Sequence, residues 1–365
     1  MKPTLTLLTV LLLAPLAATA ADGYLDAGVG SVTDRLVSFV DFAPTVLSLA
    51  GVKLPSHFQG SAFLGEQAGP AREYVYGIRD RMAERLDCVR AVRDRQYQYN
   101  RNFHPHLSWS QFVSYTEEMP TMKAWRALAE AGKLSGPAAR YFEPRKPVEE
   151  LYDTNADPHQ IHNLAGDPKH CATLEKFRAE CERWMIATGD LGLLPEYELH
   201  CRVKDGAPYD LKANPLPALI EAAHTTKAPR LVKLLENADP ALRWWGAAGL
   251  VGLGGGAKPA ESSLRKALAD SAPEVRIAAA EAIGNLGDDA AALPVLTAAL
   301  RHESQFVRLA ALNVLDRFGA RAKPALPDIR AAGMKSKDHV AGYVNRMVSY
   351  MPAWIESGNR KVENE

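Results

Sequence analysis

The spacing of apolar positions divides the chain into an early segment of mixed strands and helices and a later segment that is helical throughout. Residues 74–78 have the composition of a strand, and residues 87–93 and 96–101 predict a hairpin that turns at Asp94 and Arg95. Apolar residues then recur at helical spacing, at Leu174, Phe177, Cys181, Trp184 and Met185. The pattern predicts an α+β subdomain in which a helix packs on a small antiparallel sheet.

Two shorter helices are expected in the same segment. Asp41 is suited to cap a helix that has Pro44 in its first turn and stops at Gly51. A second helix is expected at residues 122–131, followed by proline-rich sequence. Prolines recur between 195 and 217, which indicates a linker after the subdomain.

Beyond the linker the chain repeats itself. Arg243, Arg276 and Arg308 each begin an Ala-rich helical stretch, and they are spaced 33 and 32 residues apart. Each stretch follows another helix, so the period is one helical hairpin, and the units resemble HEAT repeats. Leu250, Ile283 and Leu315 occupy the same position in successive units and are expected to form a continuous buried ridge. We therefore predict an α-α superhelix over residues 218–355, capped by a helix at residues 340–354.

The charge balance restricts the class of partner, and the amino-terminal sequence indicates the compartment. Lys plus Arg and Asp plus Glu are 43 each, so the balance gives no general attraction to nucleic acid or to an anionic membrane. Residues 1–20 read as a secretory signal peptide, with Lys2, an apolar run and a small-residue cleavage site. No later stretch approaches the length of a membrane span. We expect an exported chain, periplasmic or secreted, with no membrane attachment after signal cleavage.

The four cysteines permit disulfides in an exported chain without requiring them. Cys171 and Cys181 are ten residues apart in one predicted helix, about 15 Å, which is too far for a bond. If a disulfide forms, Cys181 with Cys201 is the expected pair. Cys88, between Leu86 and Val89, is expected in the core.

Several stretches in the first 200 residues are weak signals singly but specific in their order. One runs from Leu36 to Val52, and a second from Glu150 to Leu164 contains Leu-Tyr-Asp, Asp-Pro and Asn-Leu. Between them lie Tyr76-Gly-Ile-Arg-Asp-Arg-Met82 and Tyr97-Gln-Tyr-Asn-Arg-Asn-Phe103. Together, over residues 32–200, they resemble the carboxy-terminal part of sulfatases of the alkaline-phosphatase-like superfamily, nearest to the heparan N-sulfatase-like branch.

The resemblance implies the fold and the catalytic groups of a sulfatase, but this sequence lacks the motifs that carry those catalytic groups. Sulfatases carry a Cys or Ser in the pattern Cys/Ser-x-Pro/Ala-x-Arg, converted to formylglycine, and a calcium site, both ahead of the segment matched here. None of the four cysteines begins that pattern, and Ser135 and Ser271 come close only with their arginines one residue late. Asp338-His339, superficially like a calcium motif, is expected to start a helix. We expect no catalytic or metal-binding residue and no cofactor in this chain, with calcium and formylglycine belonging to an absent half.

Binding residues can still be suggested. Residues 72–101 hold eight arginines, five acidic residues and no lysine, and arginine suits bidentate contact with sulfate. In sulfatases this subdomain helps to wall the substrate pocket, which makes five residues candidates for sugar contacts: Arg79, Asp80, Arg81, Arg90 and His104. The alternative is that the arginines pair with the acidic residues around them.

The repeats offer a similar choice. The arginines at 243, 276 and 308 could bind an acidic partner, or pair with Asp239, Asp270 and Asp288 of neighbouring units. Trp244 and Trp245 could form a sugar platform or pack in the core.

Taken together, the sequence predicts a signal peptide at 1–20, a sulfatase C-terminal-like subdomain at 32–200, a linker at 201–217 and HEAT-like repeats at 218–355. The function expected first is a truncated sulfatase-family protein, noncatalytic alone, related to enzymes that hydrolyse sulfate esters or sulfamates of polysaccharides such as glycosaminoglycans. Its partner would be a sulfated glycan. One alternative is an exported binding or scaffold protein that holds a protein partner on the repeats. Another is a half-enzyme complemented by a separate catalytic chain.

Overall fold

The computed structural model describes residues 33–203 and 215–358. The predicted signal peptide and most of the predicted linker lie outside these residues. None of the helices formed by the described residues is long and apolar enough to cross a membrane.

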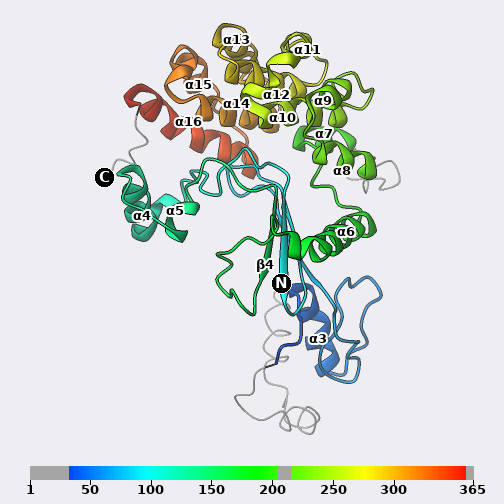
Figure 1. Cartoon of the computed structure of the whole chain (residues 1–365). Coiled ribbons are helices and arrows are strands. Elements are labelled where there is room, and N and C mark those ends of the chain that lie inside the picture. The colour runs from blue at the N-terminus through cyan, green and yellow to red at the C-terminus, as the bar shows by residue number, and fades with distance from the viewer. Residues whose placement is uncertain (1–32, 204–214, 359–365) are drawn as a thin grey trace, which may run out of the picture. The chain divides into compact units, whose positions relative to one another are not determined.

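The early segment has the predicted mixture of strands and helices (Figure 1). Its strands are β1 (Val75–Arg79), β2 (Val89–Arg93), β3 (Tyr97–Asn102) and β4 (Glu149–Asp153). Its helices are α3 (Phe42–Leu49), α4 (Pro120–Glu130), α5 (Pro137–Arg140), α6 (Cys171–Thr188) and α7 (Glu196–Arg202), with 3-10 turns η2 (Phe39–Asp41), η3 (Thr116–Glu118) and η4 (Pro168–His170).

The four strands form one antiparallel sheet in the order β1-β2-β3-β4. The hairpin between β2 and β3 turns where the sequence predicted. The Asp94 carboxylate accepts hydrogen bonds from the backbone N–H groups of Gln96 and Tyr97, at 2.8 and 2.6 Å. An aspartate that bonds the backbone two and three residues ahead fixes a tight turn. The sequence alone therefore sets this register.

The later segment is helical throughout, as predicted. Its helices are α8 (Leu216–His224), α9 (Ala228–Leu234), α10 (Pro240–Leu253), α11 (Glu261–Ala267), α12 (Pro273–Asn285), α13 (Asp289–Ala299), α14 (Gln305–Phe318), α15 (Leu326–Ala331) and α16 (His339–Ser357), with 3-10 turns η6 (Gly254–Ala260) and η7 (Gly319–Ala325). Leu250, Ile283 and Leu315 are fully buried in one continuous core, which confirms the predicted ridge. Figure 1 shows the helices in succession from α9 to α16.

Small residues allow the inner helices of the repeats to pack closely. A Cβ atom added at Gly284 of α12 would come within 2.3 Å of the Phe318 ring of α14, closer than atoms can approach. The terminal helix starts where expected, because the Asp338 carboxylate caps α16 by accepting from the Val340 N–H at 2.7 Å. The reading of Asp338-His339 as a helix start is therefore confirmed.

The described residues form two compact units. The first contains residues 33–77, 91–99 and 151–170, and the second contains 78–90, 100–150, 171–203 and 215–358. The second unit thus joins part of the sulfatase-like segment with all the described repeats. The predicted boundaries at 200 and 217 remain predictions.

The cysteine pairing was not as expected. All four cysteines are free, with Cys88 and Cys181 buried and Cys171 and Cys201 exposed. Cys181 points into the core as part of the apolar face of α6, whereas Cys201 is at the surface on α7, so the expected Cys181–Cys201 bond does not form. Cys88 is in the core as predicted.

Candidate functional site

Three of the five candidate binding residues belong to two sets of ion pairs, around Asp80 and around Asp87, which a hydrogen bond from the Asp87 N–H to the Asp80 carbonyl joins into one network. Arg90 is buried and donates from Nε and Nη2 to Asp190, at 2.5 and 2.9 Å, and from Nη1 to Asp80 at 2.9 Å. Hydrogen bonding to Asp190, opposed by burial, raises the pKa of Arg90 above its usual range. Arg79 lies 3.8 Å from Asp87. The alternative prediction, that the clustered arginines pair with nearby acidic residues, is therefore confirmed for Arg90 with Asp80. The pairing of Arg90 with Asp190 was not predicted.

A buried lysine completes this network. Lys146 has no exposed side-chain surface and pairs with Asp87, whose other oxygen accepts from the backbone N–H of Cys88 at 2.9 Å. Burial lowers the pKa of Lys146, while Asp87 opposes that effect. A buried charge is tolerated only when it is paired. These groups hold the strand ends together. Of the three candidates, Arg79 keeps the most capacity for a ligand, because its side chain is one-third exposed and lies 3.8 Å from Asp87.

Arg81 has a different partner. Its guanidinium forms a bidentate ion pair with Glu196 at the start of α7, with Nε 2.6 Å from Oε1. The Nη1 atom of Arg81 is buried without a hydrogen-bond partner. Arg81 therefore ties the sulfatase-like segment to α7.

The same helix is held from the other side by a repeat. The Glu274 carboxyl group of α12 accepts from the backbone N–H groups of Tyr197 and Glu198, at 2.9 and 3.1 Å. Burial raises the pKa of Glu274 to about 8, although these two bonds oppose the shift. A buried carboxyl group thus supplies the acceptor that the first turn of α7 needs.

His104 belongs to a turn that packs on the tryptophans of α10. Its ring stacks on Trp245 with centroids 5.3 Å apart and meets Trp244 edge-on at 5.7 Å, and the His106 ring lies 5.7 Å away. Burial lowers the pKa of His104 to about 4 and lowers that of His106 as well, so both rings are neutral near pH 7.

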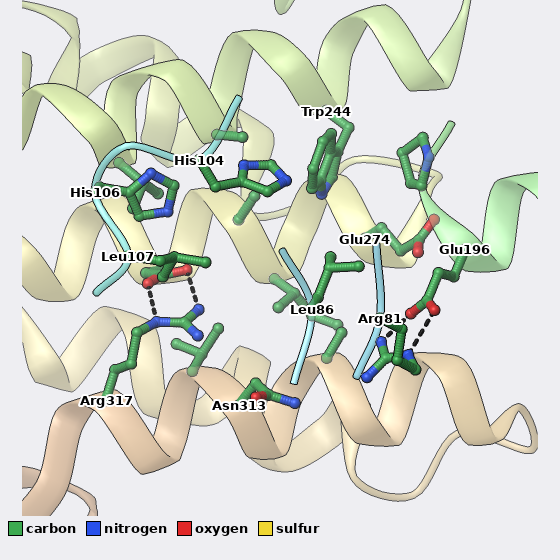
Figure 2. A pocket seen from close by; sticks show the side chains of 18 residues that line it. Arg81, Leu86, His104, His106, Leu107, Glu196, Trp244, Glu274, Asn313 and Arg317 are labelled. Atoms are coloured by element: carbon green, nitrogen blue, oxygen red, sulfur yellow. Dashed lines mark hydrogen bonds and ion pairs between the residues drawn. The ribbon is translucent and has the colours of Figure 1, made fainter. Parts of the chain in front are cut away.

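A cavity of about 90 Å³ lies in the second unit against these histidines. Figure 2 shows it between the segments carrying Arg81, Leu86 and His104–Leu107 and the helices of the repeats. The helices contribute Trp244, Glu274, Asn313 and the ion pair of Arg317 with Glu281, at 2.6 and 2.7 Å. Most of the remaining wall is apolar.

Arg85, on the same segment as Arg81, is buried among α14 and α16. It pairs with Asp316 at 2.8 Å and donates to the Asn313 side chain at 3.0 Å and to the Tyr350 hydroxyl at 2.9 Å. The Asn313 amide in turn donates to the backbone carbonyl of Glu84 at 2.9 Å. The inner face of the repeats therefore binds this chain's own sulfatase-like segment.

The structure thus separates the predicted site residues. Arg79, Asp80 and Arg90 lie in the ion-pair network, whereas Arg81 and His104 line the cavity. Substrate contact by any of the five remains a prediction. The sequence did not single out Arg85, His106, Glu274 or Asn313, and only Arg85 left a signal, as one of the eight clustered arginines.

The alternative predicted for the repeat arginines, pairing with an aspartate of a neighbouring unit, is confirmed for Arg243 alone among the three. Arg243 pairs with Asp270 of the next unit at 2.8 Å, but Arg276 and Arg308 donate to backbone carbonyls instead. Asp239 and Asp288 pair with Arg202 and Arg265. The packing interpretation of Trp245 is also confirmed, since it is buried and donates to the Leu193 carbonyl at 2.8 Å.

The block that contains Leu-Tyr-Asp and Asn-Leu has a structural role in the first unit. The Asp153 carboxylate accepts from the backbone of Asn155 and Ala156, at 3.0 and 3.1 Å. The Asn163 side chain accepts from the Leu151 N–H at 2.9 Å and from the Ala165 N–H at 3.0 Å. Across residues 33–203 and 215–358, no three His, Cys, Asp or Glu residues are grouped to hold a metal ion.

Comparison with known proteins identifies both segments. A family model described as HEAT repeats matches residues 261–338. An ulvan-active sulfatase of Formosa agariphila is 40% identical over 173 residues, which cover 47% of this chain and 29% of the relative. A second ulvan-active sulfatase of that organism is 31% identical over 175 residues, covering 44% of this chain and 31% of the relative.

A human protein adds to these matches. N-sulphoglucosamine sulphohydrolase of Homo sapiens is 29% identical over 178 residues, covering 44% of this chain and 34% of the relative. About 45% of the chain is therefore homologous to sulfatases, and the predicted fusion of a sulfatase-type segment with HEAT repeats is confirmed. The chain spans about a third of the length of the curated relatives it matches.

Proposed function

We propose that this chain is a sulfatase-related protein that binds sulfated polysaccharides and does not hydrolyse them by itself. The similarity to ulvan-active sulfatases, 40% identical over 173 residues in one case, carries the proposal. The 365 residues contain no Cys or Ser followed by x-Pro/Ala-x-Arg, which supports the absence of turnover. We further propose that the chain is exported through residues 1–20, which mass spectrometry of the secreted amino terminus can test.

The repeats have a definite place in this proposal. Arg85, Asn313 and Asp316 connect the sulfatase-like segment to the inner helices of the repeats by buried hydrogen bonds. Such bonds, made where water is excluded, resist rearrangement. We infer that the repeats brace the segment that carries Arg79 and Arg81, rather than holding a separate partner on the same face.

Two measurements test the function. Purified protein with calcium is incubated with an aryl sulfate and with a sulfated glycosaminoglycan, and we expect no release of sulfate. Release that persists through repurification would contradict the proposal.

Binding is measured by calorimetry with a sulfated polysaccharide and its desulfated form. We expect Arg79→Gln to weaken binding of the sulfated form, while Arg265→Gln, at an exposed position of helix α11, leaves it unchanged. Equal binding of both forms would refute sulfate recognition.

A second function, a half-enzyme completed by another chain, is favoured by a specific observation. Around α3 the apolar side chains of Phe39, Val40, Phe42 and Val46 are exposed. Exposed apolar patches mark surfaces that bind other protein. Co-expression with a chain that carries the amino-terminal two-thirds of a sulfatase should yield a co-purifying pair with sulfatase activity. Loss of the pair in Val46→Glu would support this function, and failure of the unaltered chains to associate would exclude it.

A further inference from the structure

The cavity beside His104 has a polar wall atom that lacks a partner. The Nη1 atom of Arg81 is buried and has no hydrogen-bond partner among the described residues. Buried polar groups are nearly always hydrogen-bonded, so a partner for this donor is to be sought in the cavity. The rings of His104 and His106 line the same cavity, and a neutral imidazole has one donor and one acceptor nitrogen.

The charged groups around the cavity are already satisfied. Arg81 pairs with Glu196, and Arg317 pairs with Glu281 through both carboxylate oxygens. The Glu274 carboxyl group accepts two backbone N–H bonds. No counter-ion remains for an ionic ligand, and the unbonded Nη1 of Arg81 adds a donor without adding net charge to its ion pair.

The rest of the wall determines size and polarity. Trp244 lines the cavity, and Leu86, Val251 and Ile277 are among its apolar lining residues (Figure 2). A volume of about 90 Å³ is several times the ~10–15 Å³ that one water requires, and somewhat below an engineered cavity of about 150 Å³ that admits benzene in another protein. The space suits a few hydroxyl-bearing carbons rather than a whole disaccharide.

We propose that this cavity is a binding site for an uncharged polyol or the hydroxymethyl end of a neutral sugar, with its hydroxyl groups bonded to the His104 and His106 rings. An aromatic side chain beside neutral donors and acceptors is suited to a ligand that has both apolar C–H surface and hydroxyl groups. The inference depends on the cavity alone and holds whether or not the chain binds sulfated polysaccharides.

Saturation-transfer NMR with glycerol and methyl glucoside as probes, each titrated against the full chain, tests the site. We expect millimolar binding of at least one probe, and we expect the probe signal to stay unchanged when sodium sulfate is added as a competitor. His104→Phe preserves ring stacking and removes the hydrogen bonds, so the dissociation constant should rise by about tenfold or more, as expected when an interaction of about 1.4 kcal/mol is lost.

A matched pair of variants locates the binding. Ala310→Leu on α14 places a larger side chain at the cavity wall and should abolish the signal, while the same change at the exposed Ala290 of α13 should leave it intact. Circular dichroism melts show that each variant is folded.

Three outcomes would overturn the proposal. The first is that neither probe binds, which would mean that the cavity holds water only. The second is that sulfate competes with the probes. The third is that the probes bind equally to the Ala310→Leu and Ala290→Leu variants. Binding of sulfated polysaccharide is scored separately. Its loss, with methyl glucoside still bound, would refute the proposed function and leave this site standing.

Discussion

At the scale of single residues, one buried arginine makes several hydrogen bonds and an ion pair in the second unit. Arg85 is 3% exposed and bonds to Asp316, Asn313, Tyr350 and the Phe112 carbonyl. It is a buried donor with several acceptors, so its removal takes a donor away from each of them. The sequence showed only that it belongs to an arginine-rich stretch.

Arg85→Met should therefore be among the most destabilising substitutions in the second unit. Breaking a buried ion pair by removing one partner costs about 3–5 kcal/mol, and the buried Asp316 carboxylate loses its ion pair with Arg85 in this variant. Urea unfolding followed by circular dichroism measures the loss. Arg265→Met, whose ion pairs lie at the surface, is the control and should melt with the parent. Equal stability of the two variants would show that the Arg85 contacts contribute nothing.

The buried histidines predict a dependence of stability on pH. Burial lowers the pKa of His104 and His224 to about 4, from an ordinary value of 6.5. Because the pKa is lower in the folded state than in the unfolded state, each neutral ring contributes fully to the free energy of unfolding above about pH 6.5. That contribution is lost as the pH falls toward 4. For His104 the loss should reach roughly 3 kcal/mol at pH 4.

Urea midpoints at pH 7 and pH 4.5 can measure this effect. His104→Phe should be less sensitive to acid than the parent, since the phenyl ring does not titrate. His159→Phe, at an exposed histidine of the first unit, should keep the parent's slope. A His104→Phe variant with the full acid sensitivity would show that protonation of this ring is not what destabilises the unit.

At the scale of elements, α3 has an inverted arrangement of side chains. Its buried residues include Thr45 and Ser48, whose side chains accept hydrogen bonds from the backbone of Phe63 and Gln67, both at 3.0 Å. The Asp41 carboxylate, just before α3, pairs with Arg72. Meanwhile Val46 is 60% exposed. Polar residues fix this helix to the following loop within the first unit, and Phe42 and Val46 face outward.

The consequence is a reversal of the usual substitution pattern. Val46→Lys should change the free energy of unfolding by less than about 0.5 kcal/mol and reduce self-association, because it removes exposed apolar surface. Thr45→Ala should destabilise the unit by about 1–3 kcal/mol, since the Phe63 N–H loses its acceptor. Thermal melts and light scattering measure both effects. If Val46→Lys proved the more destabilising variant, Val46 would be packed in solution rather than exposed.

At the scale of the whole molecule, the repeats and part of the sulfatase-like segment fold as one compact unit. The inner helices present Trp245, Glu274 and Asp316, and each is bonded to a residue before position 203. These three positions of the inner face are therefore engaged within the chain. Each repeat still covers the ridge of its neighbour, as expected for a solenoid.

An excised fragment of residues 215–358 should remain helical but unfold at a lower temperature than the full chain. The excision returns the inner face to water and forgoes the burial of its apolar surface, at about 25 cal/mol per Å². Circular dichroism melts of the fragment and the full chain give the comparison. A fragment as stable as the full chain would show that the sulfatase-like segment adds nothing to the repeats.

The sequence by itself determined the local structure. The hairpin at Asp94, the start of α16 at Asp338 and the ridge of Leu250, Ile283 and Leu315 depend on side chains a few residues apart or on a strict period. Such signals are complete within a short window of the chain, so they can be read without coordinates.

Only the tertiary structure decided which charges meet. Arg85 and Asp316 are 231 positions apart in the numbering, and no period or motif links them. Arg81 could have paired with any acidic neighbour, yet it bonds Glu196, and His104 meets the α10 tryptophans rather than the other candidate residues. Ion pairs and cavities depend on distances that arise only after helices and strands pack. The sequence therefore predicted the repeats, but it did not predict that their inner helices bind the sulfatase-like segment of the same chain.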